Sequence, residues 1–295
     1  FYPIAFSPTG KLLAAGSKGG VIKLLDAATG MEIRTFRFAG DYFSNLSIAF
    51  SPDGSMLAGF AEVSKGNERQ TMLVIWDVVT GREIRAIELD CGLPSYQPAS
   101  SLVFSPDGKY VAVGSQSWDK GKGGGVWEVA SGEKVCAFDG HTISLAFSPN
   151  AELLATARKK EGVKLLEVPT GKEIRTLKIT PPSGYEWDEC DWVTFNPDGK
   201  FLATGSYFGV ITLWEVTTGR EVYRLTGHVP SAIRSLVFSP NGRRLVSTAF
   251  DNTLRVWEAA TGNELRTLSH GVQFYENVAF SPDRKLLAYD TYGTC

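Results

Sequence analysis

Short runs of apolar residues that alternate with polar ones recur along the chain, and turn-forming residues separate them. Leu236 and Phe238 alternate before one such turn, and similar runs stand at 210–214 (VITLW) and 221–225 (EVYRL). A period of two is typical of β-strands, whereas a helix repeats its apolar face every three to four residues. The pattern therefore predicts many short strands joined by tight turns.

A six-residue motif, AFSPDG in one of its copies, occurs seven times. Its phenylalanines are Phe6, Phe50, Phe104, Phe147, Phe195, Phe238 and Phe280, which are 44, 54, 43, 48, 43 and 42 residues apart. A second motif, a glycine after a small hydroxyl residue, occurs at Gly30, Gly81, Gly132, Gly171, Gly219 and Gly262. Each of these glycines follows a large apolar or Trp position by five residues. A period in the forties predicts one group of strands per repeat.

Each motif has a backbone explanation. In Ser-Pro-Asp-Gly, Pro presets φ, Asp bonds to the backbone that follows it and Gly accepts a positive φ, so the segment makes a tight turn. Four short strands joined by turns must pair antiparallel, as a meander. One such sheet cannot bury both of its faces, so we expect the repeats to stack around a ring. The sequence therefore predicts an all-β fold, a β-propeller.

In these motifs the chain resembles the WD-repeat β-propeller family over its whole length. The family's Trp-Asp dipeptide, or a Trp-Glu, Leu-Asp or Leu-Glu variant of it, occurs at Leu25, Trp76, Trp127, Leu166, Trp214 and Trp257. The family's Gly-His pair occurs at His141 and His228, with Ser-His at His270. The resemblance implies a seven-bladed propeller of four-stranded antiparallel blades.

We expect one domain, residues 1–295, with seven repeats. Its blades are predicted at approximately 1–38, 45–89, 99–138, 142–178, 190–226, 232–268 and 276–295. Only 15 residues follow Phe280, whereas 19 separate the Phe and Trp positions in most repeats. The seventh blade is therefore expected to be incomplete here, without its third and fourth strands. Because a two-stranded blade leaves an exposed edge, roughly twenty residues from elsewhere in the protein or from another chain are expected to complete it.

The resemblance also assigns a role to one histidine. It implies that His228 joins Ser247, Asp251 and Trp257 in the buried hydrogen-bonded tetrad that ties a blade together in this family. Only the sixth repeat has all four members. Buried polar groups persist when their partners satisfy them, so we expect a structural role for His228 rather than a catalytic one.

The other two histidines depart from this pattern. His141 precedes Phe147 by six residues, whereas His228 precedes Phe238 by ten, so we expect an exposed His141. His270 has the right spacing, but a tyrosine lies near the expected hydroxyl position and no Trp follows. We therefore expect no complete tetrad at either histidine.

Irregular spacing indicates where a partner binds. The distance from the repeat Phe to the Trp position is 19 residues in repeats one, four, five and six, but 26 and 23 in repeats two and three. The extra residues are expected between the second and third strands, and the connection from the fourth strand to the next repeat varies too. Both connections emerge on one face, because antiparallel strands alternate in direction. Variable loops on a rigid scaffold commonly carry binding residues.

Aromatic and charged residues gather in these loops. Exposed aromatics are frequent interface anchors, and an acidic group (Glu186, Asp188, Glu189, Asp191) would suit a basic peptide. The predicted partner-binding residues are Tyr42, Phe43, Tyr96, Trp118, Arg158, Trp187, Asp188, Glu189, Tyr207, Phe208, Arg234, Phe250, Phe274 and Tyr275. Each aromatic could instead cap the blade beneath it, and the charged groups could belong to solvated loops.

Composition narrows the function classes. The chain has 30 Lys and Arg against 32 Asp and Glu, a net charge of −2, which argues against a strongly basic nucleic-acid binder. Neither a long apolar run nor a signal-peptide pattern is found, so no membrane span is expected. Four scattered cysteines predict neither a zinc site nor a disulfide framework. We expect cytoplasmic surroundings and no metal or cofactor.

Catalytic motifs are not found in the sequence. No Gly-Lys is followed by Ser or Thr, and neither GxSxG nor HExxH occurs. The glycine-rich segment at 121–125 (GKGGG) is interpreted as a flexible loop. We therefore predict a non-catalytic scaffold that binds a protein or peptide. The alternatives are a sensor or regulatory domain of a longer, multidomain microbial protein, with partners in the same chain, and an enzyme with its site in the propeller channel.

Overall fold

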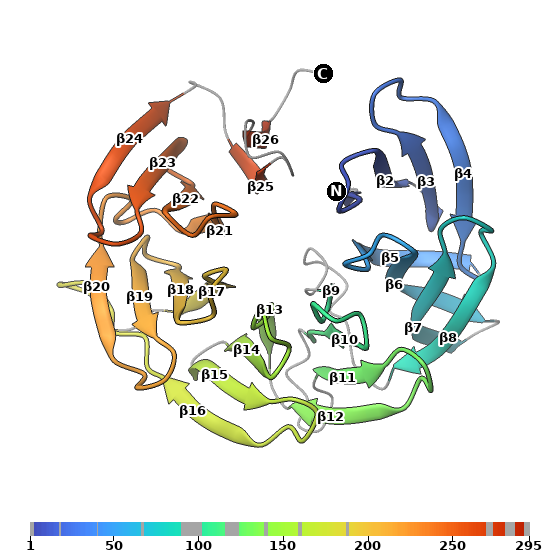
Figure 1. Ribbon diagram of the computed structural model, residues 1–295, viewed down its shortest axis with the longest axis horizontal. Helices are drawn as coiled ribbons and strands as arrows, with labels where there is room; N and C mark the ends of the chain where they lie inside the picture. Colours follow the sequence, from blue (N-terminus) through green and yellow to red (C-terminus); the bar gives the residue numbers. More distant parts are fainter. Residues whose placement is uncertain are drawn as a thin grey trace. The chain divides into compact units, whose positions relative to one another are not determined.

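The computed structural model describes residues 3–17, 19–39, 41–65, 68–89, 102–115, 124–138, 141–158, 161–186, 189–269, 274–280 and 287–291. Every regular element in these ranges is a β-strand. The strands form six four-stranded antiparallel sheets and one two-stranded sheet (Figure 1). Within the same ranges, no helix has the length and apolar character needed to cross a bilayer.

The chain divides into two compact units. The first comprises Phe1–Thr142 and Val168–Gly171. Its first sheet is β1 (Ile4–Phe6), β2 (Leu12–Ser17), β3 (Val21–Asp26) and β4 (Glu32–Arg37). Its second is β5 (Asp41–Phe50), β6 (Met56–Lys65), β7 (Glu68–Asp77) and β8 (Glu83–Leu89). Its third is β9 (Leu102–Phe104), β10 (Tyr110–Val113), β11 (Gly124–Glu128) and β12 (Lys134–Phe138).

The second unit comprises Ile143–Glu167 and Lys172–Cys295. Its sheets are β13 (Thr142–Phe147), β14 (Leu153–Arg158), β15 (Gly162–Glu167) and β16 (Glu173–Leu177), then β17 (Cys190–Phe195), β18 (Phe201–Ser206), β19 (Ile211–Glu215) and β20 (Glu221–Leu225). Next come β21 (Ile233–Phe238), β22 (Arg244–Ala249), β23 (Thr253–Glu258) and β24 (Glu264–Ser269). The seventh repeat contributes β25 (Phe274–Phe280) and β26 (Leu287–Thr291).

In every four-stranded sheet the strands pair in sequence order, so the predicted antiparallel meander is confirmed. A β-bulge interrupts the pairing of the third and fourth strands at the same repeat position in all six sheets, at Leu25, Trp76, Trp127, Leu166, Trp214 and Trp257. A bulge increases the local twist of a strand. The number of blades in a closed ring and the single domain over 1–295 stay predictions.

The Ser-Pro-Asp-Gly segments make the predicted tight turns. In the second repeat, the Ser51 hydroxyl donates to Asp53 at 2.6 Å and accepts the Met56 N–H at 2.9 Å. The Gly54 N–H closes the turn on the Ser51 carbonyl at 2.9 Å. Gly54 has a φ of +74°, a region that favours glycine because it has no Cβ.

The acidic residue of each Trp-Asp or Trp-Glu pair organises the second turn. The Asp77 carboxylate accepts the Thr80 N–H at 2.6 Å and the Thr80 hydroxyl at 2.7 Å. These donors hold the pKa of Asp77 below its usual value. The same hydroxyl contact recurs between Asp26 and Thr29, Glu128 and Ser131, Glu215 and Thr218, and Glu258 and Thr261. In these five repeats the hydroxyl residue before Gly is therefore a partner of the acidic residue.

Apolar side chains pack between neighbouring sheets of a unit. Trp76 is 3% exposed, and its ring lies 5.6 Å from Phe36 and 5.2 Å from Phe38 of the preceding sheet. A Cβ on Gly59 would lie 2.9 Å from Trp76 Cζ3, so glycine makes room for the indole.

Side chains of the fourth strands add polar contacts between neighbouring sheets. Arg34 of β4 donates to the carbonyls of Val79 at 2.7 Å and Thr80 at 2.9 Å, in the turn between β7 and β8. The same contact recurs between Arg85 and Ala130, Arg175 and Thr217, and Tyr223 and Ala259. Burial raises the pKa of Tyr223 to about 12, which keeps its hydroxyl protonated for this bond.

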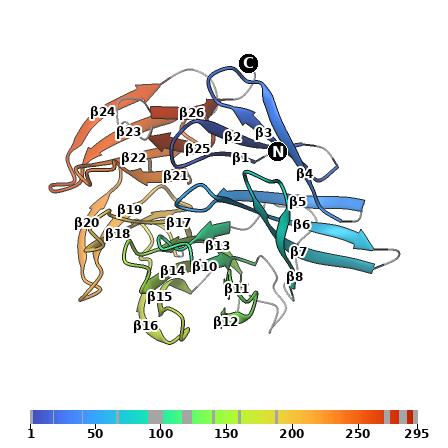
Figure 2. The same ribbon diagram turned by 45° about the vertical axis from the view of Figure 1, so that its right-hand side comes forward.

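The extra residues of the second repeat do not form a loop. They extend β6 and β7 to ten residues each, and the two strands stay paired as far as Lys65 and Glu68 (Figure 2). β5 also has ten residues, and Tyr42 and Phe43 belong to it. The prediction that these two aromatics lie in a loop is therefore wrong. The longer segments pair with one another and satisfy their backbone groups in the sheet.

In the glycine-rich segment at 121–125, Gly124 and Gly125 begin β11, and residues 121–123 lie outside the described residues. A Cβ on Gly124 would overlap the Val113 carbonyl and the Phe138 ring. Glycine at this position lets β11 approach β10 and β12, so the interpretation of the whole segment as a flexible loop is wrong.

Candidate functional site

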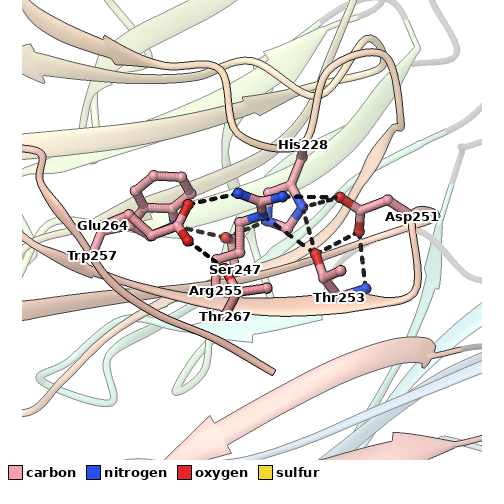
Figure 3. Close-up of polar contacts among 8 residues, drawn as sticks. All are labelled: His228, Ser247, Asp251, Thr253, Arg255, Trp257, Glu264 and Thr267. Atoms are coloured by element: carbon pink, nitrogen blue, oxygen red, sulfur yellow. Dashed lines mark hydrogen bonds and ion pairs between the residues drawn. The ribbon is translucent and has the colours of Figure 1, made fainter. Parts of the chain in front are cut away.

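The most extensive polar site joins the four residues of the sixth repeat (Figure 3). His228 precedes β21 and is 1% exposed. Its Nδ1 lies 2.8 Å from Asp251 Oδ2, and its Nε2 lies 2.7 Å from Ser247 Oγ of β22. The Trp257 indole N–H, from β23, donates to the same Ser247 oxygen at 2.8 Å. The site therefore connects the loop before the first strand with the second and third strands.

The Asp251 carboxylate is held by several groups. It accepts the Thr253 N–H at 2.9 Å and the Thr253 hydroxyl at 2.7 Å, and Arg255 Nη2 lies 4.0 Å away. Partial burial acts to raise the pKa of Asp251, but the hydrogen bond and charge of His228 and the Thr253 donors hold the pKa below its usual value. Arg255 continues the network through Glu264 at 2.6 Å. Asp251 therefore stays ionised at neutral pH.

Ser247, His228 and Asp251 have the order of hydrogen bonds found in hydrolase triads. The Ser247 side chain is fully buried, and its oxygen already receives the Trp257 N–H. A substrate carbonyl has no access to a nucleophile in that environment, so the arrangement supports a structural role. Among the described residues, no three His, Cys, Asp or Glu side chains lie close enough together to hold a metal ion.

The expectation of an exposed His141 is wrong, because the structure buries it to 9% exposure. β13 starts at the next residue, Thr142, whose N–H donates to the Ser115 carbonyl at 2.6 Å. His141 therefore directly precedes the strand, at a segment that is tied to the Ser115 carbonyl. His270 lies outside the described residues.

Sequence reasoning missed a related pair in the fifth repeat. The Trp214 indole N–H donates to Thr204 Oγ1 at 2.9 Å, and Thr204 is 2% exposed. The spacing in the sequence could have revealed this pair, because Trp214 follows Thr204 by ten residues, as Trp257 follows Ser247. The comparison was missed because this repeat has no histidine.

Several predicted partner-binding residues gather on the second unit. Tyr207 follows β18 and is 47% exposed, and Phe250 follows β22 and is 45% exposed. Phe208 is half-buried, and its ring centroid lies 5.3 Å from that of Tyr207. The Arg234 guanidinium lies 4.4 Å from the Phe250 ring centroid, a cation–π contact.

The structure does not expose two of the predicted charged residues. Arg158 is 6% exposed and pairs with Glu161 at 3.0 Å. Glu189 is 9% exposed, just before β17. Arg158 is the last residue of β14 and Glu189 directly precedes β17, so neither side chain is exposed as that of a loop residue would be. Of the predicted acidic group, Glu186 is exposed and Asp191 is half-buried.

The other predicted partner residues are not placed. Tyr96, Trp118, Trp187 and Asp188 lie outside the described residues. Tyr42, Phe43, Phe274 and Tyr275 belong to strands whose pairing is described, without their side chains.

The repeated sheets, the turns at Asp and Thr-Gly, and the tetrad define a repeat of the WD type. The family model described as "WD domain, G-beta repeat" matches residues 4–26, 94–121, 187–215 and 219–258. These matches support the predicted resemblance to the WD-repeat family. Proteins of this family generally act as scaffolds for protein interactions and are typically non-enzymatic.

Three curated proteins are similar to part of this chain, and one of them is named as a WD repeat-containing protein. The chain is 29% identical over 181 residues to "Probable U3 small nucleolar RNA-associated protein 18" of Schizosaccharomyces pombe, covering 55% of this chain and 30% of that protein. It is 28% identical over 180 residues to "SEC12-like protein 1" of Arabidopsis thaliana, covering 59% and 42%. It is 29% identical over 174 residues to "WD repeat-containing protein SL1-17" of Schistosoma mansoni, covering 57% and 51%. The matched segments thus span about half or less of these relatives.

Proposed function

We propose that this protein is a non-catalytic scaffold that binds a protein or peptide through the turns β18–β19 and β22–β23. The observation that carries the proposal is the pair Tyr207 and Phe250. They occupy the same repeat position in neighbouring sheets of one unit, and 47% and 45% of their surfaces are exposed. Large aromatics that stay exposed are common anchors of protein interfaces.

Both anchors stand on turns that the backbone holds in place. The Tyr207 N–H donates to the Glu189 carbonyl at 2.8 Å, and the Phe250 N–H donates to the Ala232 carbonyl at 3.1 Å. Each bond ties the turn after the second strand to the segment before the first strand. A preformed anchor loses little conformational entropy when a partner binds, which favours affinity.

Fewer exposed carboxylates support a basic partner than the sequence predicted. The burial of Glu189 removes one carboxylate from the predicted acidic group, and Arg234 adds a cation beside Phe250. Glu186 remains exposed. We propose a partner that contacts the surface mainly through apolar groups. If the partner also carries charge, we propose that it is a basic peptide.

The test is affinity purification with quantitative mass spectrometry, using cell extract of the source organism. The bait is the wild type, the double variant Tyr207→Ala/Phe250→Ala or the control Leu265→Ala, which removes a 51% exposed side chain from strand β24 of the same unit. We expect at least one bound protein to fall tenfold or more with the double variant and to stay with the control. Equal recovery of every bound protein by all three baits would overturn the proposal.

We also propose that the sheets belong to a seven-bladed ring in which further strands complete β25 and β26. Sheet β21–β24 supports this. Its Val256 and Leu268 are half-buried, whereas the corresponding Leu213 and Leu225 of the preceding sheet are 2% and 5% exposed. A crystal structure of the protein tests the proposal by counting the blades and locating the strands that pair with β26. A ring of another blade number would contradict it.

A cytoplasmic location is proposed on the cysteines. Cys136 and Cys190 are both buried as free thiols, the state that a reducing compartment maintains. Fluorescence microscopy of the tagged protein tests this, and a signal confined to another compartment would contradict it.

A further inference from the structure

Sheets β17–β20 and β21–β24 correspond residue by residue. In one, Cys190 pairs with Ser206 and a bulge follows before Trp192; in the other, Ile233 pairs with Ala249 and the same bulge follows before Ser235. The repeat Phe positions of the two sheets are 43 residues apart. Every residue of the tetrad therefore has a defined counterpart in the fifth repeat.

The counterparts of Ser247 and Trp257 keep their contact. They are Thr204 and Trp214, joined by the indole N–H at 2.9 Å. The Thr204 hydroxyl donates to the Thr212 carbonyl at 3.3 Å, so it has an acceptor in its own sheet. This half of the tetrad is complete without a histidine.

The counterparts of His228 and Asp251 are aromatic. Tyr185 precedes Cys190 by five residues, as His228 precedes Ile233, and Phe208 follows Ser206 by two residues, as Asp251 follows Ala249. The Tyr185 and Phe208 ring centroids lie 4.1 Å apart, with 33° between the ring planes. The two rings join the same two segments that the His–Asp hydrogen bond joins in the next sheet.

The remaining contacts of Asp251 are also replaced. Asp251 accepts the Thr253 N–H at 2.9 Å, and in the fifth repeat Ser206 Oγ accepts the corresponding Val210 N–H at 3.1 Å. Gly209, at the position of Asn252, has a φ of +79° where Asn252 has +60°. The turn β18–β19 thus keeps the backbone of its polar counterpart.

We propose that Tyr185 and Phe208 form an aromatic latch that replaces the His–Asp pair and positions the turn β18–β19, which presents Tyr207. The inference rests on the proposed binding role of Tyr207 for its functional meaning. Phe208 contacts both tyrosines, at 4.1 and 5.3 Å between centroids, so its ring fixes the neighbouring anchor. The latch also fastens the long connection from β16 to β17, where the Tyr185 N–H donates to the Pro182 carbonyl at 3.2 Å.

The sharpest test converts the latch into the polar pair. Thr204 and Trp214 are already in place, so Tyr185→His with Phe208→Asp recreates the residue types of the sixth repeat. We expect each single variant to lower the melting temperature by roughly 2–4 °C, since it leaves either an unstacked ring or a poorly paired carboxylate. We expect the double variant to recover at least half of the larger loss. Additive losses in the double variant would overturn the proposal.

A local measurement keeps the test decisive if the Asp variant does not fold. We expect Tyr185→Leu to speed hydrogen exchange of the Tyr207 amide, bonded to Glu189, by roughly tenfold or more. The Phe250 amide of the neighbouring sheet is the internal control and should exchange at its wild-type rate. Tyr185→Phe keeps the ring and should leave both amides unchanged. Unchanged Tyr207 exchange in Tyr185→Leu would overturn the latch.

These outcomes are separable from those of the proposed function, because neither measurement involves a partner. If Tyr207→Ala/Phe250→Ala retains every bound protein while the Tyr185 and Phe208 variants behave as expected, the latch stands and the binding role fails. If Tyr207→Ala/Phe250→Ala loses a bound protein but Tyr185→Leu leaves hydrogen exchange of the Tyr207 amide unchanged, the binding role stands and the latch fails.

Discussion

His228 is a buried ring with both nitrogens paired, one to a carboxylate and one to a hydroxyl. Ser247 serves two partners at once, His228 at 2.7 Å and Trp257 at 2.8 Å. Removing His228 or Trp257 leaves the buried Ser247 hydroxyl with one partner fewer. In such networks the loss of a partner costs more than the bond itself contributes.

His228→Ala is therefore expected to lower the free energy of unfolding by roughly 1–3 kcal/mol, because Ser247 and Asp251 lose their shared partner. Urea unfolding followed by tryptophan fluorescence measures the loss. Leu265→Ala, on the surface of β24, is the control and should stay within about 0.5 kcal/mol of the wild type. A melting curve of His228→Ala identical to that of the wild type would refute the structural role.

Asp251 makes the stability of the tetrad depend on pH. Its pKa is lowered in the folded protein, so its contribution to stability is present above the pKa of the unfolded chain and is lost as pH falls through the folded pKa. We expect Asp251→Asn to be less stable than the wild type at pH 7 and the difference to shrink as pH falls below about 4. Free energies of unfolding measured from pH 7 to pH 3 test this, and a constant difference across that range would contradict it.

Two glycines of the first unit are required for different reasons, one in a strand and one in a turn. Gly124 opens β11, and a Cβ there would overlap the Val113 backbone carbonyl. Gly19 lies in a turn with a φ of +79° and nothing within 4 Å of an added Cβ. Gly124 is therefore required by close packing, whereas Gly19 is favoured only by its backbone conformation.

Gly124→Ala is expected to lower the free energy of unfolding by roughly 2 kcal/mol or more, because β10 or β12 must move to admit the methyl group. Gly19→Ala is the matched control, expected to cost only about 1–2 kcal/mol through its left-handed backbone. Chemical unfolding of both variants measures the losses. A Gly124→Ala variant as stable as the wild type would show that β11 is not closely packed.

Neighbouring sheets of a unit are joined by more than apolar contact. Arg34, Arg85 and Arg175 occupy one position of the fourth strand and donate to backbone carbonyls in the next sheet. Tyr223 makes the same kind of bond from that position. Arg266 stands there in sheet β21–β24 and is exposed. The contact joins sheets β1–β4, β5–β8, β13–β16 and β17–β20 each to a turn of the next sheet.

Arg34→Lys is expected to lower the free energy of unfolding by about 1 kcal/mol, since an ammonium cannot reproduce the fork that reaches both Val79 and Thr80. Arg37→Lys, at an exposed position of the same strand, is the control and should have no measurable effect. Thermal unfolding of the two variants gives the comparison. Equal melting temperatures for both would mean that the two hydrogen bonds contribute nothing.

The local order of strands and turns could be predicted from sequence because its causes are local. Ser-Pro-Asp-Gly and Thr-Gly turns act over a few residues, and alternation with a period of two identifies the strands between them. The tetrad was predicted from the resemblance to the WD-repeat family, whose members place these four residue types at the positions that the sixth repeat fills. Family resemblance then supplied their roles.

The burial of particular side chains could not be predicted from local sequence signals. His141, Arg158 and Glu189 were expected at the surface, and the structure buries all three. Their exposure depends on where a strand begins and on what packs above it, which involves residues far apart in the chain.

The sequence alone determined the repeat and the strand order within each sheet, because both depend on spacing within one repeat, and the resemblance to the WD-repeat family implied the residues of the tetrad. Tertiary structure decided that the extra residues of the second repeat extend β6 and β7 and that Tyr185 and Phe208 stack where another repeat has a histidine and a carboxylate. Only the tertiary structure shows that these two rings are in contact, since the residue types and their spacings in the chain do not require it.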